Sequence, residues 1–543
     1  MNVEASASPH IAETRSKGVY IAAILVVIVA LAGYMTWRAL QPQLTLAMNS
    51  SGVKSLRYRN TELLGFGEFR VLEILLKDSK GNLRPANLSG SSRVDIVHNS
   101  WTGSYSWGTV SADYKVVGSR LNITIRTRNL SQDIIESVAY EPIGFKFPRK
   151  VREYDGVVPL LSHNIGNPAL VTMSFGKGTL VLADEDVRKP LLIGFPWALD
   201  KPTNTLFPLR VNTGRDRRFP DMLPYIHRPI APGAEDSLTL SLRFGPPGSS
   251  PLVLGKDVLE RFAQAYPSQL KWKDRRPIGS VILATLNAKW PANPRGWFLN
   301  PTLDVTKPEG RADFKQRMLK TADTTVGILK DMNAQGMIMW DVEGEESPTA
   351  TYVGDPRQFA DFAPEMADVA DEFFKKFRDA GLRVGVCIRA TEAVWSPDHR
   401  TAFQLESPNP EKLLLDKITW AKRRWGATLF YLDSNGEPAR PLDAGILERL
   451  SAAEPDVLIV PEQKNVRYFA STAPYFDMRE GLISVPSAVR AVYPNAFSVV
   501  NTADGPIVKR HNELLAAVKE GDILLFRSWY VDPANADIKS LYY

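Results

Sequence analysis

The second half of the chain contains eight apolar, strand-like runs, each followed by a helical pattern. Because strands that alternate with helices pair in parallel, eight such units predict an α/β TIM barrel, (β/α)8. Barrels of this kind carry their chemistry at the carboxyl ends of the strands. The predicted strands are Ser280–Leu286, Gly336–Trp340, Leu382–Ile388, Ala427–Leu432, Asp456–Pro461, Tyr475–Met478, Ala496–Asn501 and Asp522–Trp529.

The segments between these runs carry apolar residues at three- and four-residue spacing, which predicts helices. Gly381 and Gly426 stand where a helix must end before the next strand begins. The sixth strand is the weakest of the eight by pattern. The predicted helices are Arg311–Ala334, Gln358–Ala380, Pro410–Trp425, Asp443–Ala453, Ser487–Tyr493 and Lys509–Lys519.

Residues 42–255 show a different pattern, with many short alternating or β-branched runs separated by Gly, Asn, Asp and Pro. Such spacing is typical of an all-β sandwich domain. A Pro- and Gly-rich stretch at 245–251 closes this region, and residues 256–278 form a linker with helical spacing. The barrel then occupies residues 279–543.

An uncharged apolar run lies near the start of the chain, from Gly18 to Trp37. Its length matches the roughly 20 residues that a helix needs to cross a bilayer. We expect a cytoplasmic tail at 1–17, a single transmembrane anchor at 18–38 in the inner (cell) membrane, and a large periplasmic or extracellular part. A cleaved signal peptide is the alternative, although its apolar region is usually only about 7–15 residues long.

Composition argues against several classes of protein. The formal charge is +6 over 543 residues and no basic block is present, so a nucleic-acid partner is not expected. The six histidines are scattered without ligand spacing, which predicts no metal site. The single cysteine, Cys387, lies inside an apolar strand and is expected to be a packed thiol.

Carboxylates follow two neighbouring predicted strands, Asp433 after the fourth and Glu462 after the fifth. Adjacent strands lie about 4.8 Å apart, close to the roughly 5–5.5 Å between the two carboxyls of a retaining glycosidase. We predict Asp433 as the nucleophile and Glu462 as the general acid/base, with a pKa raised by a partly apolar setting. Asp433 could instead serve only the turn that it begins.

Other polar and aromatic residues follow the remaining strands and are predicted to bind substrate, because sugars need carboxylates, arginines and flat aromatic faces. A salt-bridge role for Asp341 and Glu343, and core packing for Trp290 and Trp297, are equally compatible with the pattern. The predicted substrate-binding residues are Asp341, Glu343, Arg389, Asn435, Asp504, Trp290, Trp297, Arg527 and Trp529.

A β-sandwich that precedes a (β/α)8 barrel, with the segment Phe430-Tyr-Leu-Asp-Ser-Asn-Gly436, resembles the α-galactosidase, α-glucosidase and endo-α-N-acetylgalactosaminidase families of glycoside hydrolases. The resemblance implies α-linked sugars, retention and no cofactor. In the α-amylase pattern the acid/base and third carboxylate would be Glu462 and Asp504, although Tyr431 replaces the arginine of that pattern. In the α-galactosidase pattern the acid lies on strand six, where Asp477 would be the match.

The sequence therefore favours a membrane-anchored retaining glycosidase that acts on a polysaccharide or glycoconjugate. A non-catalytic carbohydrate-binding component of a polysaccharide export or modification system is the alternative. A barrel enzyme for phosphorylated metabolites fits less well, because neither of the last two strands ends in a Gly-rich phosphate cradle. The sugar, the linkage, endo or exo action and the oligomeric state are left open.

Overall fold

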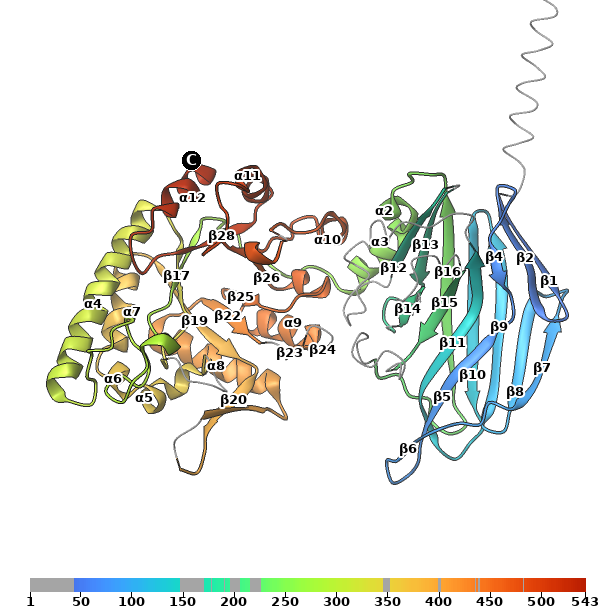
Figure 1. Ribbon diagram of the computed structural model, residues 1–543, viewed down its shortest axis with the longest axis horizontal. Coiled ribbons are helices and arrows are strands. Elements are labelled where there is room, and N and C mark those ends of the chain that lie inside the picture. The colour runs from blue at the N-terminus through green and yellow to red at the C-terminus, as the bar shows by residue number, and fades with distance from the viewer. Residues whose placement is uncertain are drawn as a thin grey trace, which may run out of the picture.

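The computed structural model describes residues 43–146, 170–176, 178–189, 191–195, 206–214, 226–344, 352–398, 402–434, 436–437, 440–481 and 483–543. The predicted tail and membrane anchor at 1–38 lie outside these ranges. Within them, no helix is both long and apolar enough to span a bilayer. Two domains follow one another along the chain, an all-β domain and an α/β barrel (Figure 1).

The first domain is the predicted sandwich. One sheet has the order β12 (Leu170–Phe175), β13 (Gly178–Asp184), β16 (Glu235–Gly245), β10 (Arg120–Asn129), β9 (Gly108–Val117), β8 (Ser100–Tyr105) and β7 (Gly90–Asp95). The second has the order β14 (Leu192–Gly194), β15 (Leu206–Asn212), β11 (Ile134–Lys146), β5 (Arg70–Lys77) and β6 (Leu83–Pro85), with β4 (Leu64–Phe66) beside β11. A small sheet joins β1 (Leu44–Asn49), β2 (Gly52–Tyr58) and β3 (Thr61–Glu62).

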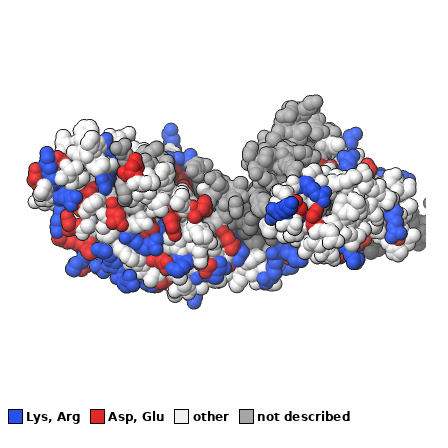
Figure 2. All heavy atoms as spheres, turned by 90° about the horizontal axis from the view of Figure 1, so that it is seen from below, with Lys and Arg blue, Asp and Glu red and all other residues white. Residues whose placement is uncertain are grey.

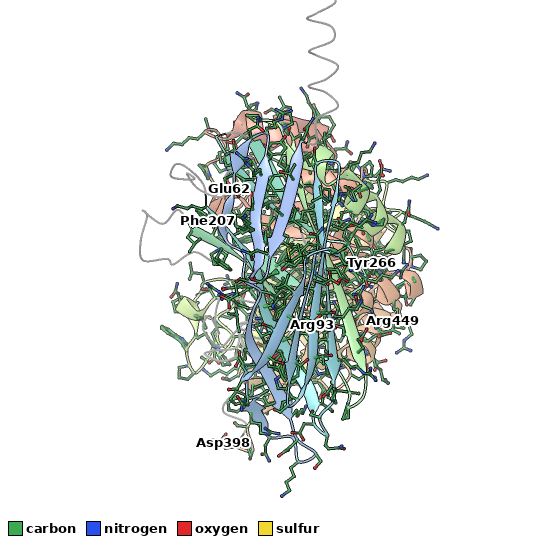
Figure 3. All side chains as sticks on the ribbon, turned by 90° about the vertical axis from the view of Figure 1, so that its right-hand side faces the viewer. Glu62, Arg93, Phe207, Tyr266, Asp398 and Arg449 are labelled. Atoms are coloured by element: carbon green, nitrogen blue, oxygen red, sulfur yellow. The ribbon has the colours of Figure 1, made fainter. Side chains whose placement is uncertain are left out.

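Alternating side chains of the two large sheets form the sandwich core. Leu121, Ile123 and Ile125 of β10 are fully buried, as are Tyr140 and Ile143 of β11. Burial of every second residue in β10 is what the alternating runs predicted, because successive side chains of a strand point to opposite faces, whereas β11 is buried on both faces over 135–145. Seen from the side of this domain (Figure 3), its strands cross the front of the view and the barrel helices lie behind them.

Two short helices, α2 (Pro251–Leu254) and α3 (Lys256–Ala265), connect the domains. Arg243 of β16 donates to the Leu254 carbonyl oxygen at 2.9 Å and pairs with Asp257, which ties the helices to the sandwich. On the other side, the hydroxyl of Tyr493 donates to the carbonyl oxygen of Tyr266 at 2.8 Å. The linker predicted at 256–278 is therefore packed against both domains.

Eight strands overlap the eight predicted ones and form one parallel sheet, although the first ends at Val281 rather than at the predicted Leu286. Its order is β25 (Leu458–Pro461), β22 (Leu429–Asp433), β19 (Arg383–Arg389), β18 (Gly336–Met339), β17 (Ile278–Val281), β28 (Ile523–Arg527), β27 (Val499–Asn501) and β26 (Tyr475–Asp477). The two end strands face each other across a seam, where the N–H of Ala473 donates to the carbonyl oxygen of Ile459 at 3.1 Å. The barrel is thus nearly closed.

The helices around the barrel match the prediction closely in four places. These are α4 (Pro308–Asp331), α8 (Pro410–Trp425), α9 (Ala444–Ala453) and α11 (His511–Lys519), with α10 (Ser487–Val492) as a shorter fifth. Asn409 caps α8 at its start, and Gly426 ends it in the left-handed conformation, with φ of 67°.

Three features differ from the prediction. The helix expected over 358–380 is broken into η3 (Pro356–Gln358), α5 (Phe359–Phe362), α6 (Pro364–Ala367) and α7 (Ala370–Asp379), because Pro364 cannot continue a helix. A hairpin of β20 (Thr391–Trp395) and β21 (Ala402–Glu406) follows β19, and α12 (Ala534–Tyr542) follows β28. Neither element was predicted.

Candidate active site

The carboxyl ends of the strands form one edge of the barrel, called the mouth here. Arg389 and Asp433 are the last residues of β19 and β22 and stand opposite each other in the register. Glu462 follows β25 directly, and β25 is the neighbour of β22. The two predicted catalytic carboxylates therefore come from adjacent strands, as expected.

Asp433 is nearly enclosed and is held by one arginine. Its side chain is 9% exposed, and Nε of Arg389 donates to Oδ2 at 2.6 Å. A second guanidinium nitrogen pairs with the same Oδ2, so both contacts with Arg389 fall on one carboxylate oxygen. Burial raises the pKa of the Asp433 carboxyl, and the charge of Arg389 opposes that rise. One oxygen is thus anchored, while no side-chain hydrogen bond reaches Oδ1 within the described residues.

The backbone N–H of Ser434, the residue after Asp433, contacts the other candidate carboxyl. It donates to Oε2 of Glu462 at 2.8 Å, and it also lowers the pKa of Asp433. Glu462 therefore reaches the turn that begins directly after Asp433. Ser434 is in the left-handed conformation, with φ of 46°, which is strained for a residue with a side chain. This strained turn brings Glu462 to Asp433.

Asp477, the alternative acid on β26, lies in a different environment. It accepts the N–H of Arg479 at 2.8 Å, and the Arg479 guanidinium holds both of its oxygens at 2.9 and 2.6 Å. Asn501 and the hydroxyl of Tyr475 add contacts at 3.1 and 3.2 Å. Burial by itself raises the pKa of Asp477, but the bonds from Arg479 and Asn501 lower it below its ordinary value. The carboxylate is therefore held in its ionised form.

Asp341 and Glu343, which follow β18, are both fully buried. Oδ2 of Asp341 accepts the N–H groups of Leu283 at 2.6 Å and Ala284 at 2.5 Å, and so ties the ends of β17 and β18 together. Neither carboxyl oxygen of Glu343 has a hydrogen-bond partner in the described part of the chain. Burial, with repulsion from Asp355, raises the pKa of Glu343 to about 8. Glu343 is therefore mostly protonated at pH 7.

Asp504 and Arg527 form an ion pair on the opposite side of the mouth. The Asp504 side chain is 65% exposed, and its backbone is left-handed, with φ of 60°. Arg527 also contacts Asp532 at 3.0 Å and the hydroxyl of Tyr530 at 2.6 Å. The pair is thus more open to solvent than the pair of Arg389 and Asp433.

The three predicted tryptophans differ in exposure. Trp290 is 46% exposed in the loop after β17, and Trp529 is partly exposed after β28, so both can offer a ring face at the mouth. Trp297 is fully buried, donates to Glu365 at 2.6 Å and packs on Phe314, with ring centroids 5.2 Å apart. Trp297 is therefore a core residue, because its ring is covered. Asn435 lies outside the described residues.

Two polar positions near the site were not found by sequence reading. Lys417 of α8 is fully buried, and Asp355 lies beside it with 3.6 Å between Nζ and Oδ2. Lys417 occupies a position on the apolar face of α8, among Leu413, Leu414 and Ile418. A lysine on the apolar face of a helix is the sequence feature that could have predicted this buried cation. Cys387 is fully buried, as predicted, and burial raises the pKa of its thiol.

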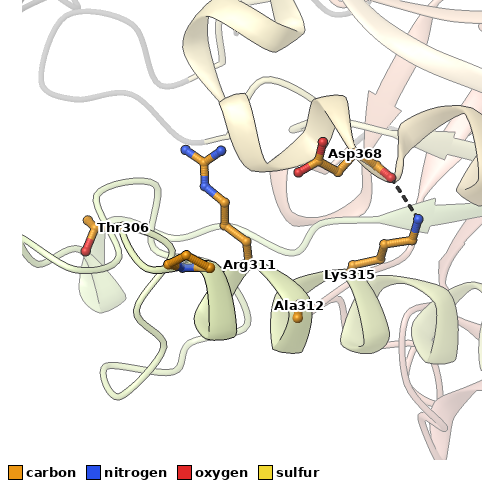
Figure 4. A pocket seen from close by; sticks show the side chains of 6 residues that line it. Thr306, Arg311, Ala312, Lys315 and Asp368 are labelled. Carbon is orange, nitrogen blue, oxygen red and sulfur yellow. Dashed lines mark hydrogen bonds between the residues drawn. The ribbon is translucent and has the colours of Figure 1, made fainter.

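Neither a metal-ligand cluster nor a surface hollow provides a second candidate site among the described residues. The described residues contain no cluster of three His, Cys, Asp or Glu side chains able to hold a metal ion. A surface hollow of ≈ 670 Å³ lies beside the start of α4, where Lys315 donates to the carbonyl oxygen of Asp368 at 3.1 Å (Figure 4). None of the candidate carboxylates lines this hollow. On the face that Figure 2 shows, basic and acidic residues are interspersed over the barrel.

No family model and no curated protein sequence matches the chain. Among solved structures, the fold is similar to an α-N-acetylgalactosaminidase from Bifidobacterium bifidum, with a TM-score of 0.52 and 10% identity over 92% of this chain and 91% of that one. An α-galactosidase from Lactobacillus brevis matches with a TM-score of 0.44 and 11% identity over 90% and 74% of the two chains. At 10% identity the similarity to the first of these shows a shared fold alone.

Proposed function

We propose that this protein is a retaining glycoside hydrolase in which Asp433 is the nucleophile and Glu462 is the general acid/base. The observation that carries the proposal is the N–H of Ser434, the residue after Asp433, which donates to Oε2 of Glu462 at 2.8 Å. Glu462 thus reaches the turn beside Asp433, and adjacent parallel strands lie about 4.8 Å apart, which supports a carboxyl separation near the roughly 5–5.5 Å that a retaining enzyme needs. The Arg389 side chain contacts Oδ2 of Asp433, which leaves Oδ1 clear of that arginine.

The reaction would proceed in two displacements. In the first, Oδ1 of Asp433 forms a bond with the anomeric carbon while Glu462 gives its proton to the departing glycosidic oxygen. In the second, Glu462 takes a proton from water, and that water displaces Asp433 to release the sugar with its original configuration. Arg389 lowers the pKa of Asp433 against the effect of burial and so favours the carboxylate, which is the nucleophilic form.

Asp477 is the second candidate for the acid. It ends the sixth strand, which is where the α-galactosidase pattern places its acid. In the free protein Asp477 receives hydrogen bonds from three neighbours and has a lowered pKa, so it is a poor proton donor. These contacts favour Glu462. If a bound sugar separated Arg479 from Asp477, Asp477 would become the better proton donor. Cleavage of substrates with good and poor leaving groups by Glu462→Gln and Asp477→Asn distinguishes the two candidates.

The class of substrate follows from the proteins of similar fold. The structure with the higher TM-score is an α-N-acetylgalactosaminidase, so we propose an α-linked sugar in a polysaccharide or glycoconjugate. Trp290, Trp529 and Tyr530 would offer ring faces at the rim, and Asp504 with Arg527 would bind hydroxyl groups. The apolar run at 18–37 supports a membrane-anchored enzyme whose catalytic part lies outside the cytoplasm.

The test of this proposal is a screen of residues 42–543 on chromogenic α- and β-glycosides, followed by two substitutions. Asp433→Asn should abolish turnover of any substrate found while the protein stays folded by circular dichroism. An Asp433→Gly variant should regain activity with azide and release a glycosyl azide, because azide can take the place of the missing carboxylate. Unchanged turnover in Asp433→Asn would rule out the nucleophile. Sugar binding without turnover would favour the alternative, a carbohydrate-binding protein.

A further inference from the structure

Lys417 is a fully buried cation whose ammonium group donates hydrogen bonds to backbone carbonyl oxygens near the mouth. Its Nζ donates to the carbonyl oxygens of Gly354 at 3.0 Å, Arg389 at 2.9 Å and Thr391 at 2.8 Å. These bonds account for all three ammonium protons. A buried charge is strongly unfavourable unless it is paired and hydrogen-bonded. The presence of a buried lysine at this position therefore calls for a structural or functional explanation.

The place of Lys417 in the chain relates it directly to Asp433. Lys417 lies on α8, the helix that connects β19 to β22, so it lies between the strands that end in Arg389 and Asp433. Two of its three acceptors, the carbonyl oxygens of Arg389 and Thr391, flank the point where the chain leaves β19. The N–H of Arg389 donates to the carbonyl oxygen of Gly354, the third acceptor, at 2.9 Å. The backbone of Arg389 is therefore fixed from both sides.

We infer that Lys417 is a positioning residue for the nucleophile, because it fixes the backbone from which Arg389 reaches Oδ2 of Asp433. This inference rests on the proposed function for its catalytic meaning, but its structural step does not depend on any reaction. Burial, Arg389 and the N–H of Ser434 set the pKa of Asp433, and Lys417 is not among these direct influences. The contacts that link Lys417 to Asp433 run through Arg389, whose carbonyl oxygen binds Lys417 and whose side chain binds Oδ2 of Asp433.

The charged groups that face Lys417 are consistent with such a role. Asp355 balances its charge at 3.6 Å and is itself held by Arg357 at 2.8 and 2.7 Å. The buried Glu343 is close enough for its charge and that of Lys417 to affect each other.

The test compares Lys417→Met with Lys412→Met on the wild-type chain. Lys412 lies on the same helix but is 69% exposed and pairs only with Asp416, so its loss is the matched control. With Lys417→Met, Arg389 is less well placed, and the acidic limb of the kcat/KM profile should move to higher pH by about 0.5–1 unit, with kcat falling roughly tenfold. Lys412→Met should leave both unchanged.

A double-mutant cycle with Arg389→Met separates positioning from a purely structural role. If Lys417 acts through Arg389, then Lys417→Met adds no further shift of the acidic limb in the Arg389→Met background. Additive shifts, or lower activity with an unmoved limb, would overturn the inference. Should Lys417→Met fail to fold, Lys417→Gln and Lys417→Arg replace it, and Lys417→Arg is expected to retain the wild-type profile because it keeps charge and donors.

A readout without turnover keeps this result apart from the proposed function. Carboxyl ¹³C NMR of aspartate-labelled protein, with Asp433→Asn to assign the signal, measures the pKa of Asp433 directly. A higher pKa in Lys417→Met than in Lys412→Met supports the inference, even if no glycoside is ever cleaved. An unchanged pKa overturns it, even if the enzyme is active.

Discussion

The two arginine–aspartate pairs at the mouth differ in how the arginine contacts the carboxylate and in the direction in which the pKa of that carboxyl is shifted. Arg389 reaches only Oδ2 of Asp433, and burial leaves the pKa of that carboxyl raised. Arg479 holds both oxygens of Asp477, with further bonds from Asn501 and Tyr475, and there the pKa is lowered. Arg479 is 56% exposed and Arg389 only 14%, so deeper burial of the first pair and the larger number of hydrogen bonds in the second both contribute to the difference in pKa. A loosely held carboxylate suits attack on carbon, and a tightly held one suits binding.

The largest effect that separates the two regions concerns proton donation. Glu462→Gln should reduce cleavage of glycosides with poor leaving groups by about 10²–10⁴-fold and spare those with good ones. Asp477→Asn should reduce kcat/KM for all substrates to a similar extent, because it removes a binding contact. Steady-state kinetics on aryl glycosides of graded leaving-group pKa check this. The reverse pattern would assign the acid to Asp477.

The next effect concerns the arginine of the first pair. Arg389 lowers the pKa of Asp433, so Arg389→Met should raise that pKa and keep the nucleophile protonated to higher pH. The acidic limb of kcat/KM should move toward neutral pH, and the rate at pH 7 should fall by about 10–100-fold. An Arg479→Met variant, measured in parallel, should lower affinity with the limb unmoved. If the acidic limb of kcat/KM lay at the same pH in both variants, the two arginine–aspartate pairs would not differ in their effect on the nucleophile.

A third prediction concerns stability and Glu343. Its pKa is about 8 in the folded chain, against 4.5 for an ordinary glutamate, so the folded state binds more protons between these values. Stability should therefore fall as pH rises from about 4.5 to 8, and be fully retained below that window. Glu343→Gln should remove this loss, which is worth on the order of 2–4 kcal/mol at pH 8.5.

Urea unfolding of both forms at pH 5 and pH 8.5 measures the effect of Glu343→Gln. The variant should be more stable than wild type at pH 8.5 and nearly equal to it at pH 5. Equal stabilities at both values would mean that Glu343 is ionised and solvated in the folded protein.

The smallest effect is expected at the exposed pair of Asp504 and Arg527. Because Asp504 is 65% exposed, Asp504→Asn should change the free energy of unfolding by only about 0–1 kcal/mol. Thermal unfolding by calorimetry checks this. A large loss of stability would show that this side of the mouth is as tightly coupled as the side that carries Asp433.

The strands of the barrel could be predicted from sequence because parallel strands buried on both faces form continuous apolar runs. The match is closest at α8, which has both an Asn cap and a Gly stop. Pro364 ends one helical turn and begins the next, whereas the apolar spacing around it continues as if the helix were unbroken. The β20–β21 hairpin was missed because its short alternating runs lie between two stronger βα signals.

The candidate site could be predicted only in part. Adjacent strands indicated that Asp433 and Glu462 lie close together, but nothing in the sequence indicated that Ser434 adopts a left-handed turn between them. The burial of Trp297 depends on Glu365 and Phe314, which are distant in sequence. Arg389 was predicted to bind substrate, and its contact with Asp433 could not be read from the sequence. Such pairings depend on tertiary contacts that local patterns do not encode.

The central claim is that Asp433 forms a covalent bond with the sugar, and trapping that bond tests it most directly. The protein would be incubated with 5-fluoro-α-glycosyl fluorides of galacto and gluco configuration, digested and analysed by mass spectrometry. The account predicts one glycosylated peptide, with the sugar on Asp433, and no labelling of Asp433→Asn. A label on Glu462 or Asp477 would contradict it.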